Sequence, residues 1–331
     1  MKHHIAASVA LLILGCGATP QGPNMPDAPA PPPPSPKQVS QPIDPQLRRA
    51  AEAELDAALA SSNAIIRANA IEASQRAVDS PSAVARVTKG LSDSNGLVRF
   101  AATMAAGAMQ RPEWHATLIE LANDRDDNVR VGARYALHKL GDFRLSHDFE
   151  KLVLDPKPSV RANAVLALGL MGEPSAMKLL QAVQLDASPA VRLQTTEAMH
   201  RLGDARAAER LMAGTISTYA DDQIVSILAL VQGRGPTDKV YKVLQGNLTG
   251  DYVEVNLAAA RALGTIGSDE GMGVAIKAVP SKDARQRAMA ALALGAIGRS
   301  DAQPHLAKLL KDSDPNVRLA AAAAVLQLRA A

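Results

Sequence analysis

Apolar positions recur along residues 45–331 with a period of 31 residues. The period is set by a phrase, Asp-x-x-x-x-Val-Arg, which is followed by small and aliphatic residues. Four arginines stand 31 residues apart in this phrase: Arg99, Arg130, Arg161 and Arg192. Counted from the arginine, positions −1, +3, +6, +7 and +10 are apolar, which places them on one face of an α-helix. In one copy this face is Val160, Ala164, Ala167, Leu168 and Met171.

Further copies extend the pattern in both directions. The arginine position is taken by Arg67, Asn256, Arg287 and Arg318, and a degenerate copy between Arg192 and Asn256 has Ile224 or Val225 there. Glycine often stands at +11, where it ends the helix by adopting a left-handed conformation. A shorter helix such as residues 176–184 precedes each of these helices. The pattern predicts an all-α fold, an α-solenoid formed by a superhelical stack of about nine two-helix repeats of 31 residues.

The phrase, continued as Ala-x-x-Ala-Leu-Gly-x-Ile-Gly, resembles the HEAT repeat, particularly the short form found in phycobilisome lyases. The resemblance implies a ladder of Asp and Arg side chains between adjacent repeats, with the two residues six positions apart. The pairs that match are Asp93/Arg99, Asp124/Arg130, Asp155/Arg161, Asp186/Arg192 and Asp312/Arg318.

The ladder is expected to lapse where the acidic residue is missing. This occurs at Ser61/Arg67, Gly250/Asn256 and Ser281/Arg287, and in the degenerate copy. The weak stretch, from about residue 215 to residue 285, has three interpretations: a bend, a specialised binding segment or sequence drift.

Composition narrows the candidate functions. Aromatic residues make up 2% of the chain and the net charge is +3, so neither stacking platforms nor a basic nucleic-acid surface is expected. No phosphate-binding loop, nucleophile elbow or paired-cysteine motif is present. His138 and His200 share position +8 two repeats apart, too far for one metal ion, and are expected to be surface or inter-repeat side chains. We therefore expect no metal, cofactor or nucleic acid.

The first residues resemble a bacterial lipoprotein signal peptide. Residues 1–16 read MKHHIAASVALLILGC, a basic start followed by a short apolar run that ends at the single cysteine. The last four residues resemble a lipobox, which implies cleavage before Cys16 and lipid attachment to it. An ordinary signal peptide cut after Ala18 is the alternative. Gly17 after the cysteine implies, by the family's sorting rule, the outer membrane.

Proline dominates the next segment, with eleven of the 21 prolines between Pro20 and Pro45. Such a segment has little to bury and favours extended chain. The expected organisation is a signal peptide over 1–15, a lipidated cysteine and disordered tether over 16–44, and a repeat solenoid over 45–331.

A binding surface is expected on the second helix of each repeat. Position +5 points away from the apolar stripe and is a candidate for the concave face, although packing between repeats would explain it equally well. The residues there are Met104, Tyr135, Leu166, Glu197, Arg261 and Leu292. The first helix is charged, as a capping element should be, whereas the last has little polar cover and is expected to dock a partner or a second copy.

These observations favour a non-enzymatic, membrane-tethered scaffold that binds a protein or peptide in the bacterial cell envelope. The alternative is an enzyme, or an enzyme subunit, of the HEAT-like lyase class that acts on a ligand in the groove. Two relatives of that kind are disfavoured. Deoxyhypusine hydroxylases bind iron through His-Glu pairs and this chain has no His-Glu dipeptide, while bilin lyases act on cytosolic proteins that an exported lipoprotein would seldom meet.

Overall fold

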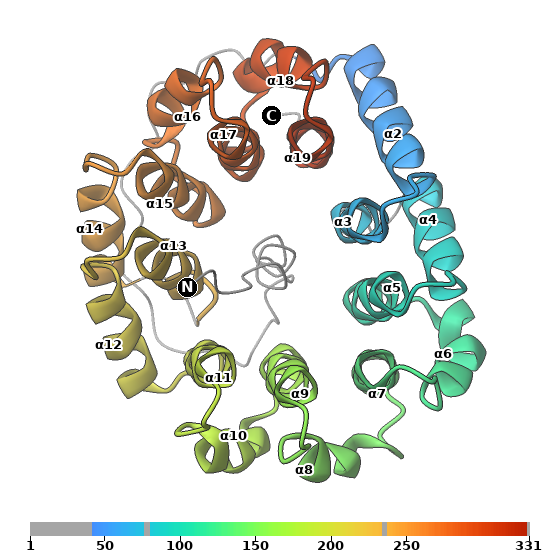
Figure 1. The fold of residues 1–331 in the computed structure, drawn as a ribbon. Helices are drawn as coiled ribbons and strands as arrows, with labels where there is room; N and C mark the ends of the chain where they lie inside the picture. Colours follow the sequence, from blue (N-terminus) through green and yellow to red (C-terminus); the bar gives the residue numbers. More distant parts are fainter. Residues whose placement is uncertain (1–41, 76–79, 234–236, 330–331) are drawn as a thin grey trace.

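The computed structural model describes residues 42–75, 80–233 and 237–329, and within these ranges all regular structure is helical (Figure 1). Each repeat has a first and a second helix, so the predicted all-α solenoid is confirmed. The first helices are α2 (Pro45–Leu59), α4 (Pro81–Leu91), α6 (His115–Leu121), α8 (Phe149–Leu152), α10 (Met177–Val183), α12 (Ala205–Gly214), α14 (Asp238–Gly246), α16 (Met272–Ala278) and α18 (Gln303–Leu309). The second helices are α3 (Ala64–Ser74), α5 (Gly96–Met109), α7 (Asp127–Lys139), α9 (Pro158–Met171), α11 (Pro189–Arg201), α13 (Ala220–Leu230), α15 (Val253–Thr265), α17 (Ala284–Ile297) and α19 (Pro315–Val325).

Local sequence sets both ends of the second helices. The residue four positions before the repeat arginine caps the N-terminus, and in several repeats its side chain accepts a hydrogen bond from the backbone two residues on. Asn63, Asn95, Asp126, Asp283 and Asp314 cap their helices in this way. At the other end of α9, Gly172 takes a φ of 78°, which ends the helix at little steric cost.

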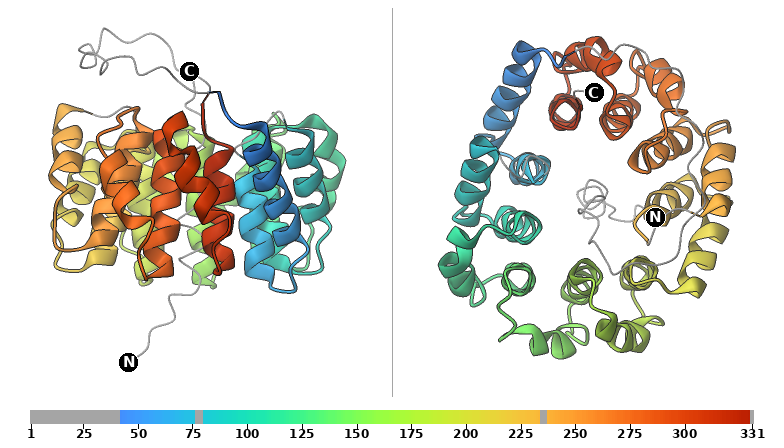
Figure 2. Two further views of the ribbon diagram at one scale, coloured as in Figure 1. Left: turned by 90° about the horizontal axis from the view of Figure 1, so that it is seen from above. Right: turned by 180° about the vertical axis from the view of Figure 1, so that it is seen from behind.

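The stack closes into a ring. Figure 1 shows the second helices as an inner ring, most of them seen nearly end-on, and the first helices as an outer ring around them; Figure 2 shows the same ring from the side and from behind. The last helix, α19, packs against both α2 and α3, so the two ends of the repeat array are neighbours. The predicted stack of repeats therefore closes into a ring, a curvature that the repeat pattern does not specify.

Specific polar contacts join the two ends. Arg318 of α19 donates to Glu54 of α2 at 2.9 Å, and the backbone N–H of Asp44 donates to Oε1 of Gln303 at 2.7 Å. The apolar residues of α19, from Ala321 to Val325, are buried. The hypothesis that this helix is exposed and docks a partner is wrong, because the first repeat of the same chain already covers it.

Small residues let the inner helices approach closely. Four glycines stand at position +8, each facing the second helix of the next repeat: Gly107, Gly169, Gly264 and Gly295. A Cβ added at Gly295 would lie 2.6 Å from Cα of Ala324, well inside van der Waals contact. Alanine-rich second helices follow from this geometry, since larger side chains would push the neighbouring backbones apart.

The buried apolar residues form two clusters. The larger one spans most of the ring and crosses the junction of the chain ends. The smaller one comprises residues of α12, α13, α14 and α15, from Leu211 to Leu263. The two clusters meet within α12, where Ala207 belongs to the larger cluster and Leu211 to the smaller, and again within α15, where Leu257 belongs to the larger and Leu263 to the smaller. One of these two divisions therefore lies near the α11–α12 repeat boundary.

The predicted signal peptide, Cys16 and the proline-rich segment up to residue 41 lie outside the described residues. Among the helices that the structure does describe, none is long and apolar enough to cross a bilayer.

Candidate functional site

The repeat arginines form a ladder whose rungs differ from those expected. Arg99 donates through Nη1 to the backbone oxygen of Asp93, six residues earlier, at 2.8 Å. Its Nε and Nη2 bind the carboxylate of Asp124, in the next repeat, at 2.8 and 2.7 Å. Arg161 repeats this arrangement, with the backbone oxygen of Asp155 and the carboxylate of Asp186. The carboxylate that pairs with each of these arginines thus belongs to an Asp about 25 residues later in the chain. The Asp six residues before the arginine accepts a hydrogen bond from it only through its backbone carbonyl oxygen.

Two repeats in which the Asp–Arg ladder was expected to be interrupted do have a rung. Arg67 pairs with Asp93 at 2.9 Å and Arg287 pairs with Asp312 at 2.6 Å, although serine stands six residues before each arginine. The hydrogen bond from the guanidinium holds the pKa of Asp93 below its usual value, and Arg287 does the same for Asp312. The same ladder crosses the ends of the chain, where Arg318 finds its carboxylate in Glu54.

Other repeats have no such rung. Arg130 pairs with Asp127 of its own helix, and that carboxylate also binds Lys157 of the next repeat. Arg192 donates to the backbone oxygens of Asp186 and Ala187, at 2.7 and 3.0 Å. The residue 25 positions after Arg192 is Ser217, which cannot supply a carboxylate.

The degenerate repeat has glutamine at the arginine position. The side-chain amide of Gln223 donates to the backbone oxygen of Ser217, six residues earlier, as the arginines do in their repeats. Its backbone N–H accordingly donates to the carbonyl oxygen of Tyr219, the N-cap residue of α13. The assignment of Ile224 or Val225 to this position is wrong, and the 31-residue step continues from Arg192 to Gln223.

Position +5 is mostly packing surface. Met104, Tyr135, Leu166 and Arg261 are buried, and Glu197 and Leu292 are half-buried. For the four buried side chains the concave-face interpretation is wrong, because the side chain at +5 fills the gap between adjacent second helices. Tyr135 shows the reason, since a Cβ at Gly107 of the preceding repeat would lie 2.3 Å from its Cε1.

Burial also changes the ionisation of two of these groups. It raises the pKa of Tyr135 to about 12, and it raises the pKa of Glu197 to about 7. Glu197 accepts a hydrogen bond from Gln194 of the same helix at 3.1 Å.

The two histidines at position +8 take the place of the glycine found in other repeats. Nε2 of His200 donates to the carbonyl oxygen of Leu230 in the next second helix at 3.0 Å, and burial lowers the pKa of this histidine. Nδ1 of His138 lies 2.9 Å from Oγ of Ser146, and its ring contacts Phe143 edge-on. Each histidine therefore has its own separate contacts. No group of three potential metal ligands gathers anywhere in the described ranges.

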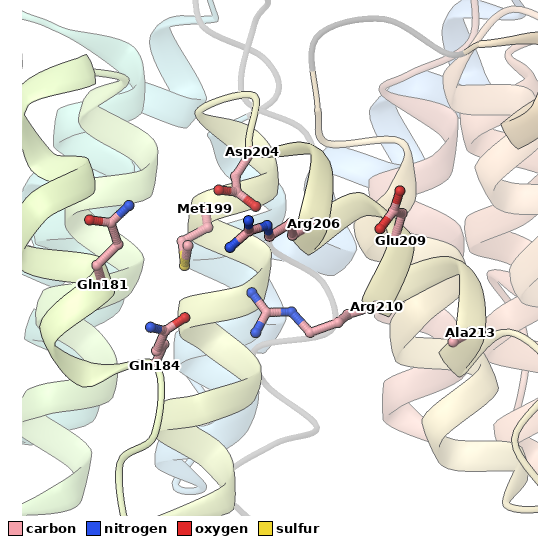
Figure 3. Close-up of a pocket in the computed structure, with 8 residues that line it drawn as sticks. All are labelled: Gln181, Gln184, Met199, Asp204, Arg206, Glu209, Arg210 and Ala213. Atoms are coloured by element: carbon pink, nitrogen blue, oxygen red, sulfur yellow. The ribbon is translucent and has the colours of Figure 1, made fainter.

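A groove opens on the outer surface between α10 and α12, with α11 as its floor (Figure 3). Its volume is about 760 Å³. The residues that line it are Gln181, Gln184, Met199, Asp204, Arg206, Glu209, Arg210 and Ala213. Met199 is buried at the base, and the polar side chains stand on the two walls.

Two arginines dominate this groove. Arg206 and Arg210 are one helical turn apart on α12, so both guanidinium groups reach into it (Figure 3). Asp204 is occupied as the cap of α12, accepting from the backbone of Ala207 at 2.7 Å, and Glu209 points away from both arginines. Neither arginine has a hydrogen-bonding or ion-pairing partner among residues 42–75, 80–233 and 237–329. The groove therefore offers two exposed cationic groups.

The sequence model of the family described as HEAT repeats matches residues 46–142, 149–231 and 242–327. The chain belongs to the HEAT-repeat family. Among solved structures it is similar to human deoxyhypusine hydroxylase, at 20% identity over 86% of this chain and 99% of that one, with a TM-score of 0.39. It is also similar to the CpcE–CpcF complex of phycocyanin lyase from Nostoc sp. PCC7120, at 20% identity over 86% and 97%, with a TM-score of 0.36. Kap121p bound to Pho4p is 15% identical over 86% and 38%, with a TM-score of 0.36. None of the curated proteins matches the chain.

The HEAT pattern did not lead to the groove. The repeat pattern predicts a binding surface on the second helices, whereas the groove lies between two first helices and is lined mainly by α10 and α12. One sequence feature could have indicated the groove, because α12 (ARAAERLMAG) carries two arginines four residues apart, which places them on the same face of the helix. Their lack of acidic partners depends on tertiary packing and could not be read from the sequence.

Proposed function

We propose that this HEAT ring is a non-enzymatic scaffold, held at the bacterial cell envelope by a lipid on Cys16, that binds a partner protein. The binding part of the proposal is supported by the groove between α10 and α12, which presents exposed polar and cationic groups on a closed, densely packed ring. A folded ring of this kind gives a rigid surface, and rigid surfaces bind without a large ordering cost.

The tether part of the proposal rests on the sequence. The single cysteine stands where a lipobox requires it, and the proline-rich segment that follows suits an extended spacer. Gly17 after the cysteine favours the outer membrane by the lipoprotein sorting rule.

The test compares the full-length chain with its Cys16→Ser variant in intact cells. We expect the unmodified chain to incorporate labelled fatty acid and to sediment with membranes, and the variant to do neither. Chemical crosslinking in intact envelopes, followed by purification of the chain, is expected to recover a protein that an unrelated lipoprotein of similar abundance does not recover. Recovery of the same bulk lipoproteins by both chains would contradict the scaffold role.

A further inference from the structure

The groove lies where the ring is internally discontinuous. The arginine ladder has no carboxylate rung between Arg192 and the next repeat, the apolar core divides within α12, and His200 replaces the glycine that brings other inner helices together. These three features concern the same boundary, between the α10–α11 repeat and the α12–α13 repeat. The missing carboxylate rung and the histidine at position +8 also occur two repeat boundaries earlier, between α7 and α9, at Arg130 and His138. The opening between α10 and α12 lies at the boundary where the division of the apolar clusters joins these two features.

An exposed aliphatic side chain follows each of the two helices that form the groove walls. Leu185 comes directly after Gln184, which lines the groove at the end of α10, and Ile216 comes two residues after the end of α12. They are the two most exposed large apolar side chains among the described residues, at 86% and 81%. Single exposed aliphatic residues are ordinary, but here one follows the end of each of the two helices that form the groove.

We propose that this groove binds a segment of the partner protein in which carboxylate side chains stand next to aliphatic ones. The proposal rests on the scaffold function above and names the chemistry of its ligand. Arg206 and Arg210 bind the carboxylates through their paired N–H groups, because guanidinium matches carboxylate geometry. Leu185 and Ile216 contact the aliphatic side chains, and the amides of Gln181 and Gln184 bond the backbone of the segment.

The charges of the walls favour a peptide over a phosphate polymer. Asp204 and Glu209 also line the groove without pairing with Arg206 or Arg210, so the two cationic groups stand among acidic ones and do not form a continuous basic surface. A polymer with a phosphate at every unit would bring negative charge close to Asp204 and Glu209, which would repel it. A peptide can place its few carboxylates at the two arginines alone. Nucleic acid binding instead requires a basic surface along the backbone path.

The experiment uses the full-length lipidated chain in non-ionic detergent and three fluorescent twelve-residue peptides. They consist of three copies of Asp-Leu-Glu-Leu, of Asn-Leu-Gln-Leu or of Lys-Leu-Arg-Leu, and binding is followed by fluorescence anisotropy. We expect the acidic peptide to bind at least about tenfold more tightly than the other two, because each hydrogen bond to a charged group is worth roughly 1.5–3 kcal/mol.

Variants locate the binding. The double substitution Arg206→Glu with Arg210→Glu is expected to weaken binding of the acidic peptide about tenfold or more, and Leu185→Ser about threefold. Arg48→Glu with Arg49→Glu makes the same charge change on the exposed surface of α2 and is expected to leave the affinity within about twofold. Circular dichroism confirms that each variant is folded.

Equal binding of the acidic and neutral peptides, or equal losses in the two double variants, would overturn the proposal. So would tighter binding to anionic lipid vesicles or to a short single-stranded DNA. If a specific partner is still recovered from envelopes by the Arg206→Glu, Arg210→Glu chain, this inference fails while the scaffold function stands. If no partner is recovered by the unmodified chain, the scaffold function fails first.

Discussion

The close approach of α15 and α17 makes a sharp prediction about Gly264. A Cβ at this position would lie 2.5 Å from the backbone nitrogen of Ile297 and 2.8 Å from the carbonyl carbon of Ala296. Both contacts are to backbone, so a side-chain rotation cannot relieve them. We therefore expect Gly264→Ala to destabilise the ring, although alanine is the better helix former.

The magnitude follows from two opposing effects. Replacing a helical glycine by alanine normally stabilises a protein by roughly 0.5–1 kcal/mol. Forcing an extra carbon into a packed interface costs about 1–3 kcal/mol. Because ordinary contacts lie beyond 3.4 Å, α15 and α17 would have to move apart by about 1 Å, and the cost should dominate. With an unfolding entropy of about 2.1 cal/mol/K per residue, a net loss of about 1–2 kcal/mol lowers the Tm of a ring of this size by roughly 2–4 °C.

The assay is thermal unfolding followed by circular dichroism at a fixed scan rate. The matched control is Gly273→Ala in α16, where an added Cβ would meet nothing within 4 Å. That substitution is expected to leave the Tm unchanged or to raise it by about 1–2 °C. If Gly264→Ala raised the Tm as much as Gly273→Ala, the close packing of the inner helices would be refuted.

Three further predictions test other parts of the structure. Glu54→Arg places two arginines together at the ring junction, so hydrogen exchange should rise in both α2 and α19, whereas an open array would show the effect in α2 alone. Arginine lowers the pKa of Asp93, Asp186 and Asp312, so these carboxylates stabilise the fold above their unfolded pKa of about 4 and lose that effect as the pH falls through the folded pKa. The denaturant midpoint should accordingly fall as the pH drops below about 4, and less steeply in Arg161→Leu; an equal slope in both chains would contradict the ladder. Ser217→Asp supplies a carboxylate 25 residues after Arg192 and should stabilise the protein by about 0.5–1 kcal/mol in urea unfolding, a gain that Arg192→Gln should abolish.

Much of the fold follows from the repeating sequence, because each repeat has the same local requirements. Capping residues four positions before the arginine, apolar residues on one helical face and glycine at the C-terminus all act within one repeat. These signals sufficed to predict two helices per repeat and the all-α solenoid. They extend to Gln223, whose place becomes clear once the 31-residue step is counted from Arg192.

The repeat pattern in the sequence could not predict that the array closes into a ring. It depends on the sum of small rotations between successive repeats, and each rotation is set by packing at positions such as Gly264 and His200. The pairing of Arg318 with Glu54 joins residues 264 positions apart and has no counterpart in the periodic phrase.

The candidate site was predicted less well than the fold. The +5 positions point away from the stripe of their own helix, but the neighbouring helix covers most of them, as Tyr135 shows. The groove depends on an opening between two first helices and on arginines without partners, which are properties of packing.

We propose that the groove between α10 and α12 holds a partner protein while the chain is at its membrane. Site-specific photo-crosslinking in intact cells tests this, with a photo-crosslinking residue in place of Gln184 in the full-length chain. We expect a discrete adduct that disappears when Arg206 and Arg210 are replaced by glutamate, and no such adduct when the photo-crosslinker replaces Arg49 on α2. The same adducts at both positions, or an adduct at Gln184 that persists without the arginines, would contradict it.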